Sequence, residues 1–204
     1  MGEAIIIYGK SGTGKSRSLK NFDEDEILFV NTVNKRLPFP KRFKYEMKGA
    51  NTALIKDKLA KMPCKTAVID DFGYQQTMRF MEGHGQKDGF ALYNQIADDA
   101  YSMIMFIKTA LPEDVIVYLI MHEEGNDMGE VKLKTIGKLL DQKVCLEGLV
   151  TVCLRAMKNG TERYFFRTQS DGGDISKSPE GMFELEIEND LKMVDQTVRK
   201  FWGI

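Results

Sequence analysis

The fold of this chain is decided by its first residues, Ala4-Ile5-Ile6-Ile7-Tyr8 followed by Gly9-Lys10-Ser11-Gly12-Thr13-Gly14-Lys15-Ser16. A short β-branched run leads into the pattern G-x-x-x-x-G-K-S, and a helix is expected to begin within it. A strand, a glycine-rich turn and a helix are the context in which this pattern forms a phosphate-binding loop, the P-loop. Glycines let backbone N–H groups face phosphate oxygens, which also meet the positive end of the helix. Residues Gly9–Ser16 are therefore predicted to bind a nucleoside triphosphate.

Two side chains of this loop and one downstream acid complete the predicted nucleotide site. Lys15 has the reach to contact the β- and γ-phosphates, and the Ser16 hydroxyl is a predicted ligand of Mg²⁺. Further along, Thr66-Ala67-Val68-Ile69-Asp70 is an apolar run that ends in an acid, the Walker B pattern. Asp70 is the second predicted Mg²⁺ ligand, directly or through water. ATP and Mg²⁺ are the expected cofactors.

Two further polar residues follow predicted strands and are candidates for a catalytic role. Asp71 either orients the attacking water or is a turn acid before Phe72-Gly73. His122 ends the strand expected beside the Walker B strand. It either senses the γ-phosphate or is an ordinary strand-end histidine.

Length and composition limit the class of protein. A chain of 204 residues with 43% hydrophobic and 29% charged residues is expected to form one α/β domain, residues 1–204. No apolar stretch approaches ~20 residues, and the first strand begins too early for a signal peptide, so a cytoplasmic protein is expected. Its three cysteines are expected to be small buried hydrophobes, at Cys64, Cys145 and Cys153.

The formal net charge of −1 gives no overall attraction for nucleic acid. Binding to DNA would need a local basic patch, or patches added by oligomerisation. The sequence offers two groups of basic residues, between Lys35 and Lys44 and at Lys132-Leu133-Lys134.

Predicted strands and helices alternate along the chain. This order predicts a three-layer α/β/α fold with a mostly parallel sheet, and Asn159-Gly160 predicts a C-terminal antiparallel hairpin. The stretches 83–89 and 123–130 are expected to be loops. Strands are expected at 4–8, 27–30, 43–47, 66–71, 115–121, 149–157 and 163–168, and helices at 14–22, 51–62, 74–82, 90–111, 136–146 and within 185–202.

The combination of these motifs resembles a known family. The P-loop, Asp70-Asp71, His122-Glu123-Glu124 and the tail segments Tyr164–Thr168 and Ile175–Phe183 are similar to the RecA-like core ATPases encoded by bacteriophages. These are minimal relatives of the RecA and RadA recombinases and are often placed with single-strand annealing proteins. The resemblance covers most of the chain and implies a RecA-like ATPase in the cytoplasm of a bacterial host, acting in phage DNA recombination or annealing.

The resemblance also implies partners. Copies of the chain would assemble head-to-tail into a ring or filament, with ATP at the subunit interfaces. Lys177, and next Arg167, would reach the neighbour's nucleotide as arginine fingers do; an ordinary exposed lysine is the alternative for Lys177. Single-stranded DNA would bind at 83–89 and, in particular, at loop 123–134, although the acids of the second loop count against phosphate binding.

The chain departs from the RecA pattern at one strand end. Asn31-Thr32-Val33-Asn34 stands where RecA-type enzymes usually carry a catalytic glutamate, so either Asp71 replaces it or turnover is weak. Two other functions stay open. One is a nucleoside or nucleotide kinase, although no arginine-rich lid follows the His122 strand. The other is an assembly module that binds nucleotide and barely hydrolyses it.

Overall fold

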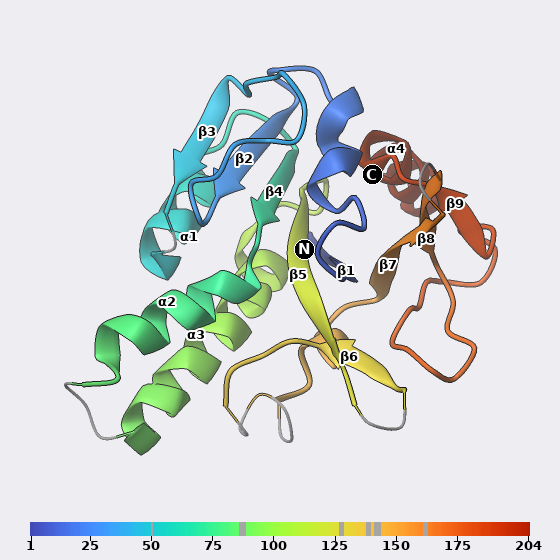
Figure 1. Ribbon diagram of the computed structural model, residues 1–204. Coiled ribbons are helices and arrows are strands. Elements are labelled where there is room, and N and C mark those ends of the chain that lie inside the picture. Colours follow the sequence, from blue (N-terminus) through green and yellow to red (C-terminus); the bar gives the residue numbers. More distant parts are fainter. Residues whose placement is uncertain (50, 86–88, 127–128, 138–139, 141–143, 161–162) are drawn as a thin grey trace.

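A mostly parallel β-sheet forms the centre of the molecule (Figure 1). The computed structural model describes residues 1–49, 51–85, 89–126, 129–137, 140, 144–160 and 163–204. Within these residues nine strands join in the order β3-β2-β4-β5-β1-β7-β8-β9, and β6 pairs with β5. The strands from β3 to β7 in this order are parallel, and β6, β8 and β9 are antiparallel to their neighbours. Their bounds are β1 Glu3–Gly9, β2 Ile27–Asn31, β3 Tyr45–Lys48, β4 Thr66–Asp70, β5 Ile116–Gly125, β6 Val131–Leu133, β7 Val152–Asn159, β8 Arg163–Arg167 and β9 Glu186–Glu188.

Helices cover both faces of this sheet, which confirms the predicted α/β class. On one face lie α1 (Thr52–Ala60), α2 (Gly73–Gly83) and α3 (Gly89–Ala110), and on the other lies α4 (Leu191–Trp202) (Figure 1). Central strands are apolar on both sides, as expected for parallel strands with helices above and below. The predicted hairpin at Asn159-Gly160 is confirmed, because β7 and β8 pair antiparallel on either side of it.

The strand order brings the predicted site residues to one edge of the sheet. β5 lies between β1 and β4 and is parallel to both, so the carboxyl ends of the three strands are neighbours. His122 on β5 is in register with Gly9 at the end of β1. Asp70 ends β4, where it is in register with Asn31 of β2. Open parallel sheets bind ligands beyond such strand ends.

A helix follows the glycine-rich loop, as expected, but it is shorter than the predicted 14–22. It is a 3-10 helix, η1, that spans Ser16–Asn21. The Ser18 hydroxyl donates to the carbonyl of Lys15 at 2.6 Å, and its N–H is shared between the Gly14 and Lys15 carbonyls. Serine side chains compete in this way with regular helical bonding. Because η1 is short, its dipole adds little to phosphate binding.

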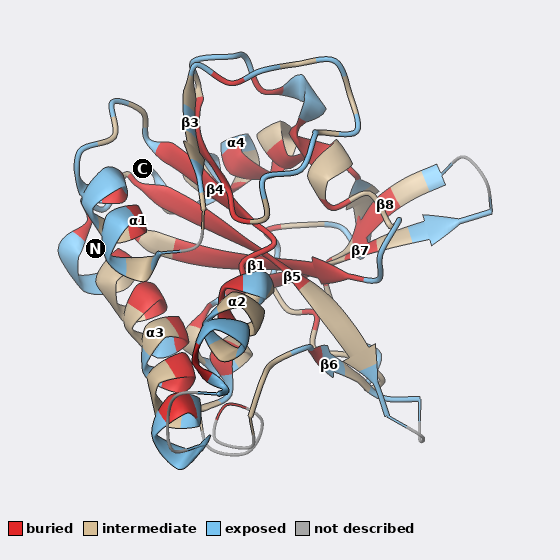
Figure 2. Cartoon of the chain, turned by 60° about the vertical axis from the view of Figure 1, so that its left-hand side comes forward, coloured by how far each residue is buried: buried red, intermediate tan, exposed pale blue. Residues whose placement is uncertain are grey.

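The stretch 123–130, expected to be a loop, is largely sheet. β5 continues to Gly125 and pairs antiparallel with β6, Glu123 opposite Leu133. Figure 2 shows the change along β5 from a buried first part to a half-buried second part. A strand can continue here because its polar side chains find partners above the sheet edge, as described below.

Three smaller expectations also need correction. In the predicted helix 136–146, Ile136 and Gly137 lie in bends and Cys145 has a left-handed φ of 49°, whereas Leu140 and Val144 are in π-helical conformation; residues 138–139 and 141–143 lie outside the described residues. Cys153 is buried, but Cys64 is half-buried and Cys145 exposed. The short strand β9 precedes α4 and was not predicted. Among the residues placed, no helix is both long and apolar enough to cross a membrane.

Candidate functional site

Lys15 is a buried cation inside the glycine-rich loop. Its side chain bends back so that Nζ donates to the carbonyls of Gly9 and Lys10, each at 2.8 Å. The residue is only 7% exposed, and burial lowers its pKa to about 8. Asp71 and Asp70 oppose this shift but do not cancel it. The ammonium group therefore lies among backbone oxygens, where an anionic ligand would be a stronger partner.

The two predicted Mg²⁺ ligands are brought together, although they are far apart in the sequence. The Ser16 hydroxyl donates to both carboxylate oxygens of Asp70, at 2.9 and 3.1 Å. Asp70 is buried, and this burial, with the charge of Asp71, raises its pKa. A hydroxyl beside a carboxylate fits Mg²⁺, which takes oxygen ligands and fills its other positions with water and phosphate oxygens. No cluster of three or more His, Cys, Asp or Glu suited to a metal occurs in the described part of the chain.

Asp71 lies next to this pair and has two polar partners. It is 2% exposed, with a left-handed φ of 58°. Its carboxylate forms an ion pair with Lys35 and accepts a contact from His122 Nε2 at 3.3 Å. Burial alone would raise the pKa of Asp71, but the bonds from His122 and Lys35 outweigh it and lower the pKa. Asp71 is thus an ionised acid that links β4 to the His122 strand.

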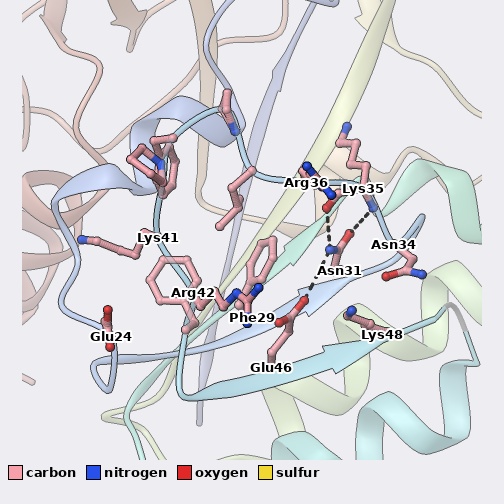
Figure 3. A pocket seen from close by; sticks show the side chains of 15 residues that line it. Glu24, Phe29, Asn31, Asn34, Lys35, Arg36, Lys41, Arg42, Glu46 and Lys48 are labelled. Atoms are coloured by element: carbon pink, nitrogen blue, oxygen red, sulfur yellow. Dashed lines mark hydrogen bonds between the residues drawn. The ribbon is translucent and has the colours of Figure 1, made fainter.

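Lys35 reaches Asp71 from a loop that is closed by Asn31. The Asn31 amide donates to the Lys35 carbonyl at 2.8 Å, and its oxygen accepts from the Lys35 N–H at 3.1 Å. Figure 3 shows Asn31 between Lys35 and Glu46. Asn34 completes the turn with a φ of 53°. Asn31 therefore holds the loop that presents Lys35.

Lys15, Ser16, Lys35, Asp71 and His122 border a pocket of about 550 Å³. The pocket joins the glycine-rich loop to η1, to the Lys35 loop and to the strand ends of β4 and β5. Its lining residues are Ser11, Gly12, Gly14, Lys15, Ser16, Arg17, Lys20, Lys35, Arg36, Pro38, Phe39, Asp71, His122 and Tyr164. A phosphate here would meet cations from two separate segments, residues 15–20 and 35–36.

An aromatic side chain packs against the glycine-rich loop. The Tyr164 ring lies so close to Gly14 that an added Cβ would be 2.6 Å from it, and Gly14 has a φ of 89°. Arg17 sits over the same ring, 4.6 Å from its centroid, and Lys158 at 4.9 Å. Only glycine at position 14 satisfies both the backbone conformation and this contact.

The structure does not bring Lys177 to the loop of its own chain. Its backbone pairs with Cys153 on β7, and Lys177 is absent from the lining of the pocket. Arg167 is paired with Asp171 at 2.9 Å and lies 3.7 Å from Asp174. Neither residue lines this pocket, so a role for either in phosphate chemistry would require a second copy of the chain.

A buried ion network occupies the base of the stretch 123–134. Arg155 donates to Glu123 through two nitrogens, at 2.8 and 2.9 Å, and to Asp174 at 3.1 Å. The Glu123 and Asp174 side chains are 2% and 1% exposed. Lys132 is paired with Glu124 at 3.1 Å. Lys134 is exposed, and in 83–89 residues 86–88 lie outside the described residues.

The sequence did not single out Lys35 or Tyr164 as site residues. In the sequence, Lys35 is only one member of a group of basic residues. No local pattern indicates that the loop after β2 folds back onto Asp71. Tyr164 lies on β8, which is separated from β1 in the sheet by β7. Both depend on long-range pairing, which local patterns do not report.

Searches against protein-family models and against curated proteins gave no match for this chain.

Proposed function

We propose that this chain binds ATP with Mg²⁺ at the Gly9–Ser16 loop and hydrolyses it, as a RecA-like core ATPase would. One observation supports this above all: the Ser16 hydroxyl and the Asp70 carboxylate meet directly beside the buried Lys15. The three residues come from two distant segments, each of which the motif patterns had predicted separately. A glycine turn with an incidental Lys-Ser would have no reason to lie against the acid of a distant strand.

The proposed chemistry assigns a task to each side chain. Lys15 would exchange the carbonyls of Gly9 and Lys10 for phosphate oxygens, and Ser16 and Asp70 would hold Mg²⁺. The metal, when bound, neutralises charge on the β- and γ-phosphates. Asp71 would orient the attacking water, while His122, which touches it, responds to the γ-phosphate.

The electrostatics of Asp71 predict slow turnover. A general base works best with a pKa near the operating pH, whereas the partners of Asp71 lower its pKa. Asp71 can therefore position a water but is a poor proton acceptor. Slow hydrolysis also agrees with an asparagine at position 31 in place of a glutamate.

The nucleotide site is tested by comparing two lysines of the same loop. Lys15→Ala removes the buried cation, and Lys10→Ala removes an exposed one. We expect Lys15→Ala to weaken binding of ATP with Mg²⁺ by at least about tenfold, or ~1.4 kcal/mol, and Lys10→Ala to change it by less than about twofold. Equilibrium binding of a fluorescent ATP analogue and release of phosphate measure the two quantities. Equal affinity in both variants would refute the site.

Assembly and the role of Lys177 are tested by mixing variants. Lys177→Ala should bind nucleotide normally but hydrolyse it more slowly if the lysine acts on a neighbouring subunit. Lys15→Ala keeps Lys177 but lacks a working site of its own. A mixture of the two proteins should then recover part of the lost turnover, and a mixture that stays as inactive as its components would remove Lys177 from the mechanism.

A further inference from the structure

A separate polar pocket lies on the face of the sheet that carries α1, α2 and α3 (Figure 1). Its lining comes from the residues after β2, from the start of α1, and from α2 and α3. Its volume of about 540 Å³ is within the range usual for small-molecule sites. We call it the glutamine pocket, after Gln75 and Gln76 in its lining. Within the described part of the chain it shares no lining residue with the proposed nucleotide pocket.

Three side chains of this lining are buried and carry a polar atom without a partner. Thr32, Gln75 and Gln76 are 1%, 6% and 3% exposed. Neither the Thr32 Oγ1 atom nor the Nε2 atom of either glutamine forms a hydrogen bond with a residue that the structure describes. Buried polar atoms are nearly always hydrogen-bonded, because an unpaired one has lost its water and gained nothing in return.

These atoms are concentrated in one place. Six buried side-chain atoms lack a partner among the described residues, and three of the six belong to the lining of the glutamine pocket. They come from two segments, the end of β2 and α2, which are far apart in the sequence. Such a concentration around a cavity indicates that their partner is a molecule from outside the chain.

The unpaired atoms define the ligand atoms that they can bind. The Gln76 Oε1 atom accepts from the Ile136 N–H at 2.8 Å, which fixes the amide so that its free end is the nitrogen. Gln75 adds a second amide nitrogen and Thr32 a hydroxyl. An amide nitrogen only donates, whereas a hydroxyl donates or accepts. The ligand therefore has to present acceptor atoms.

The charged residues of the lining disfavour an anion as the source of these acceptors. They are Arg79, Glu82 and Asp99, and Arg79 lies 3.6 Å from Asp99. One acid is thus in excess, so a phosphate or carboxylate would meet a surplus of negative charge. An uncharged hydroxyl avoids this repulsion. It accepts from an amide and can also donate to a carboxylate.

We propose that the glutamine pocket binds the hydroxylated ring of an uncharged sugar, either free or as the ribose of a nucleoside. Hydroxyl oxygens of the ring would accept from Gln75 and Gln76, and its hydroxyl hydrogens would be donated to the acids of the lining. Ile96 and Ala100 of α3 provide apolar wall for the C–H side of the ring. This site goes beyond the proposed ATP binding and does not rest on it.

NMR of the side-chain amides observes the unpaired donors directly. The ¹⁵N-labelled protein is titrated with D-ribose, D-glucose and uridine up to about 10 mM, which covers ligands with a Kd of about 1 mM. Spectra of Gln75→Leu and Gln76→Leu assign the two amide signals. We expect both signals to shift, with saturation, for at least one probe. A shift with ribose or glucose identifies a free sugar as sufficient, and a shift with uridine alone identifies a nucleoside.

Uridine 5′-monophosphate tests the role of charge. It carries the same ring as uridine with a phosphate added, and we expect it to bind this pocket roughly tenfold or more weakly. Equal or tighter binding would make the pocket an anion site and overturn the proposal. The absence of a shift with all three uncharged probes would also overturn it, because the amides would then be bound to water only.

Gln75→Leu removes one donor and keeps the approximate size of the side chain. We expect roughly tenfold or more loss of affinity for the probe, followed at the Gln76 amide. The urea midpoint of the ligand-free variant should stay the same or rise, because an unpaired buried donor has been removed. Gln196→Leu, at an exposed position on α4, is the matched control and should change affinity by less than about twofold.

Thr32→Val provides a second test on a different segment, with the same expected loss of affinity. Unchanged affinity in both variants would overturn the proposal. So would a lower urea midpoint in both, since the polar groups would then stabilise the fold and have partners within the chain.

ATP binding measured on the same variants separates this proposal from the proposed function. Gln75 and Thr32 do not line the nucleotide pocket, so both variants should keep the ATP affinity of the unaltered protein. Sugar binding without ATP binding would refute the proposed function alone. ATP binding without sugar binding would refute the glutamine pocket alone.

Discussion

Lys15, the proposed phosphate ligand, lies in an environment that disfavours its charge. Its amine is buried, and its pKa falls to about 8, against an ordinary value of 10.5. Between these two pH values the unfolded chain binds a proton that the folded chain has released. Stability therefore rises with pH across this window, because the unfolded state binds more protons there. Below pH 8 the folded protein bears the full cost of a buried charge.

Lys15→Met should remove this cost and stabilise the ligand-free protein near pH 7. The shift in pKa corresponds to at most about 3 kcal/mol, reduced by the two hydrogen bonds that the variant cannot form. Urea denaturation at pH 7, 9 and 10 measures the effect. The advantage of the variant should shrink as pH rises. An advantage that does not depend on pH would mean that Lys15 is not a destabilising charge.

Asp71→Asn is expected to separate binding from turnover. Loss of the carboxylate that positions the attacking water should lower the rate of phosphate release by roughly 100-fold, while ATP affinity changes little. Its partners Lys35 and His122 would lose their anion. Because the pKa of Asp71 is lowered in the folded state, its stabilising contribution is present above about pH 4 and is lost in stronger acid. Asp114→Asn, at an exposed acid paired with Lys65, is the control.

Among the strands, β5 has two distinct parts. Its first part is a buried parallel strand, and its second part pairs with β6 above the sheet edge. Two consecutive glutamates lie in the second part. Glu123 is buried on Arg155, whereas Glu124 is partly exposed on Lys132.

Neutralising these two glutamates should have unequal effects. Glu123→Gln leaves a buried guanidinium with less compensation, so the free energy of unfolding should fall by roughly 3 kcal/mol. Glu124→Gln removes an exposed pair and should cost less than about 1 kcal/mol. Chemical denaturation of both variants tests the difference. Similar values would show that the Arg155 network does not stabilise the fold.

How much of this architecture could be predicted depended on the range of the forces involved. The Asn159-Gly160 hairpin is a local signal, and the apolar runs of β1, β4 and β5 are strong enough to predict buried strands. A short helix was predicted after the glycine-rich loop, but its 3-10 type was not, because the serine bonds of η1 are not visible in a pattern of apolar residues. β6 and β9 have three residues each, too few to show a period.

The residues of the candidate site also fall into two groups, those that local motifs predict and those that only tertiary contacts bring to the site. Ser16 and Asp70 were predicted from motifs, and the sheet brings them together. Lys35 and Tyr164 reach the site through a loop closed by Asn31 and through a strand added late in the chain. Their contribution follows from tertiary contacts alone.

For the complete chain, nucleotide binding should appear as a gain in thermal stability. A ligand that binds only the folded state at 100 times its Kd adds about 2.7 kcal/mol. In a protein of this size that corresponds to a rise in Tm of roughly 5–10 °C. A thermal scan with and without ATP and Mg²⁺ measures it. Lys10→Ala should keep the rise and Lys15→Ala should lose most of it, whereas a rise of equal size in Lys15→Ala would place the nucleotide elsewhere.

The position of β1 in the sheet also determines the order in which the protein can be built. Its neighbours are β5 and β7, where Glu3 meets Ile116 and Ile5 meets Val152. β1 is therefore synthesised before both of its neighbours, and it has no partner in this sheet until Ile116 and the residues after it have been made. Through that interval Ala4–Tyr8 is an exposed β-branched segment, the kind that associates with other chains. A nascent chain that stalls before Ile116 should therefore aggregate through β1.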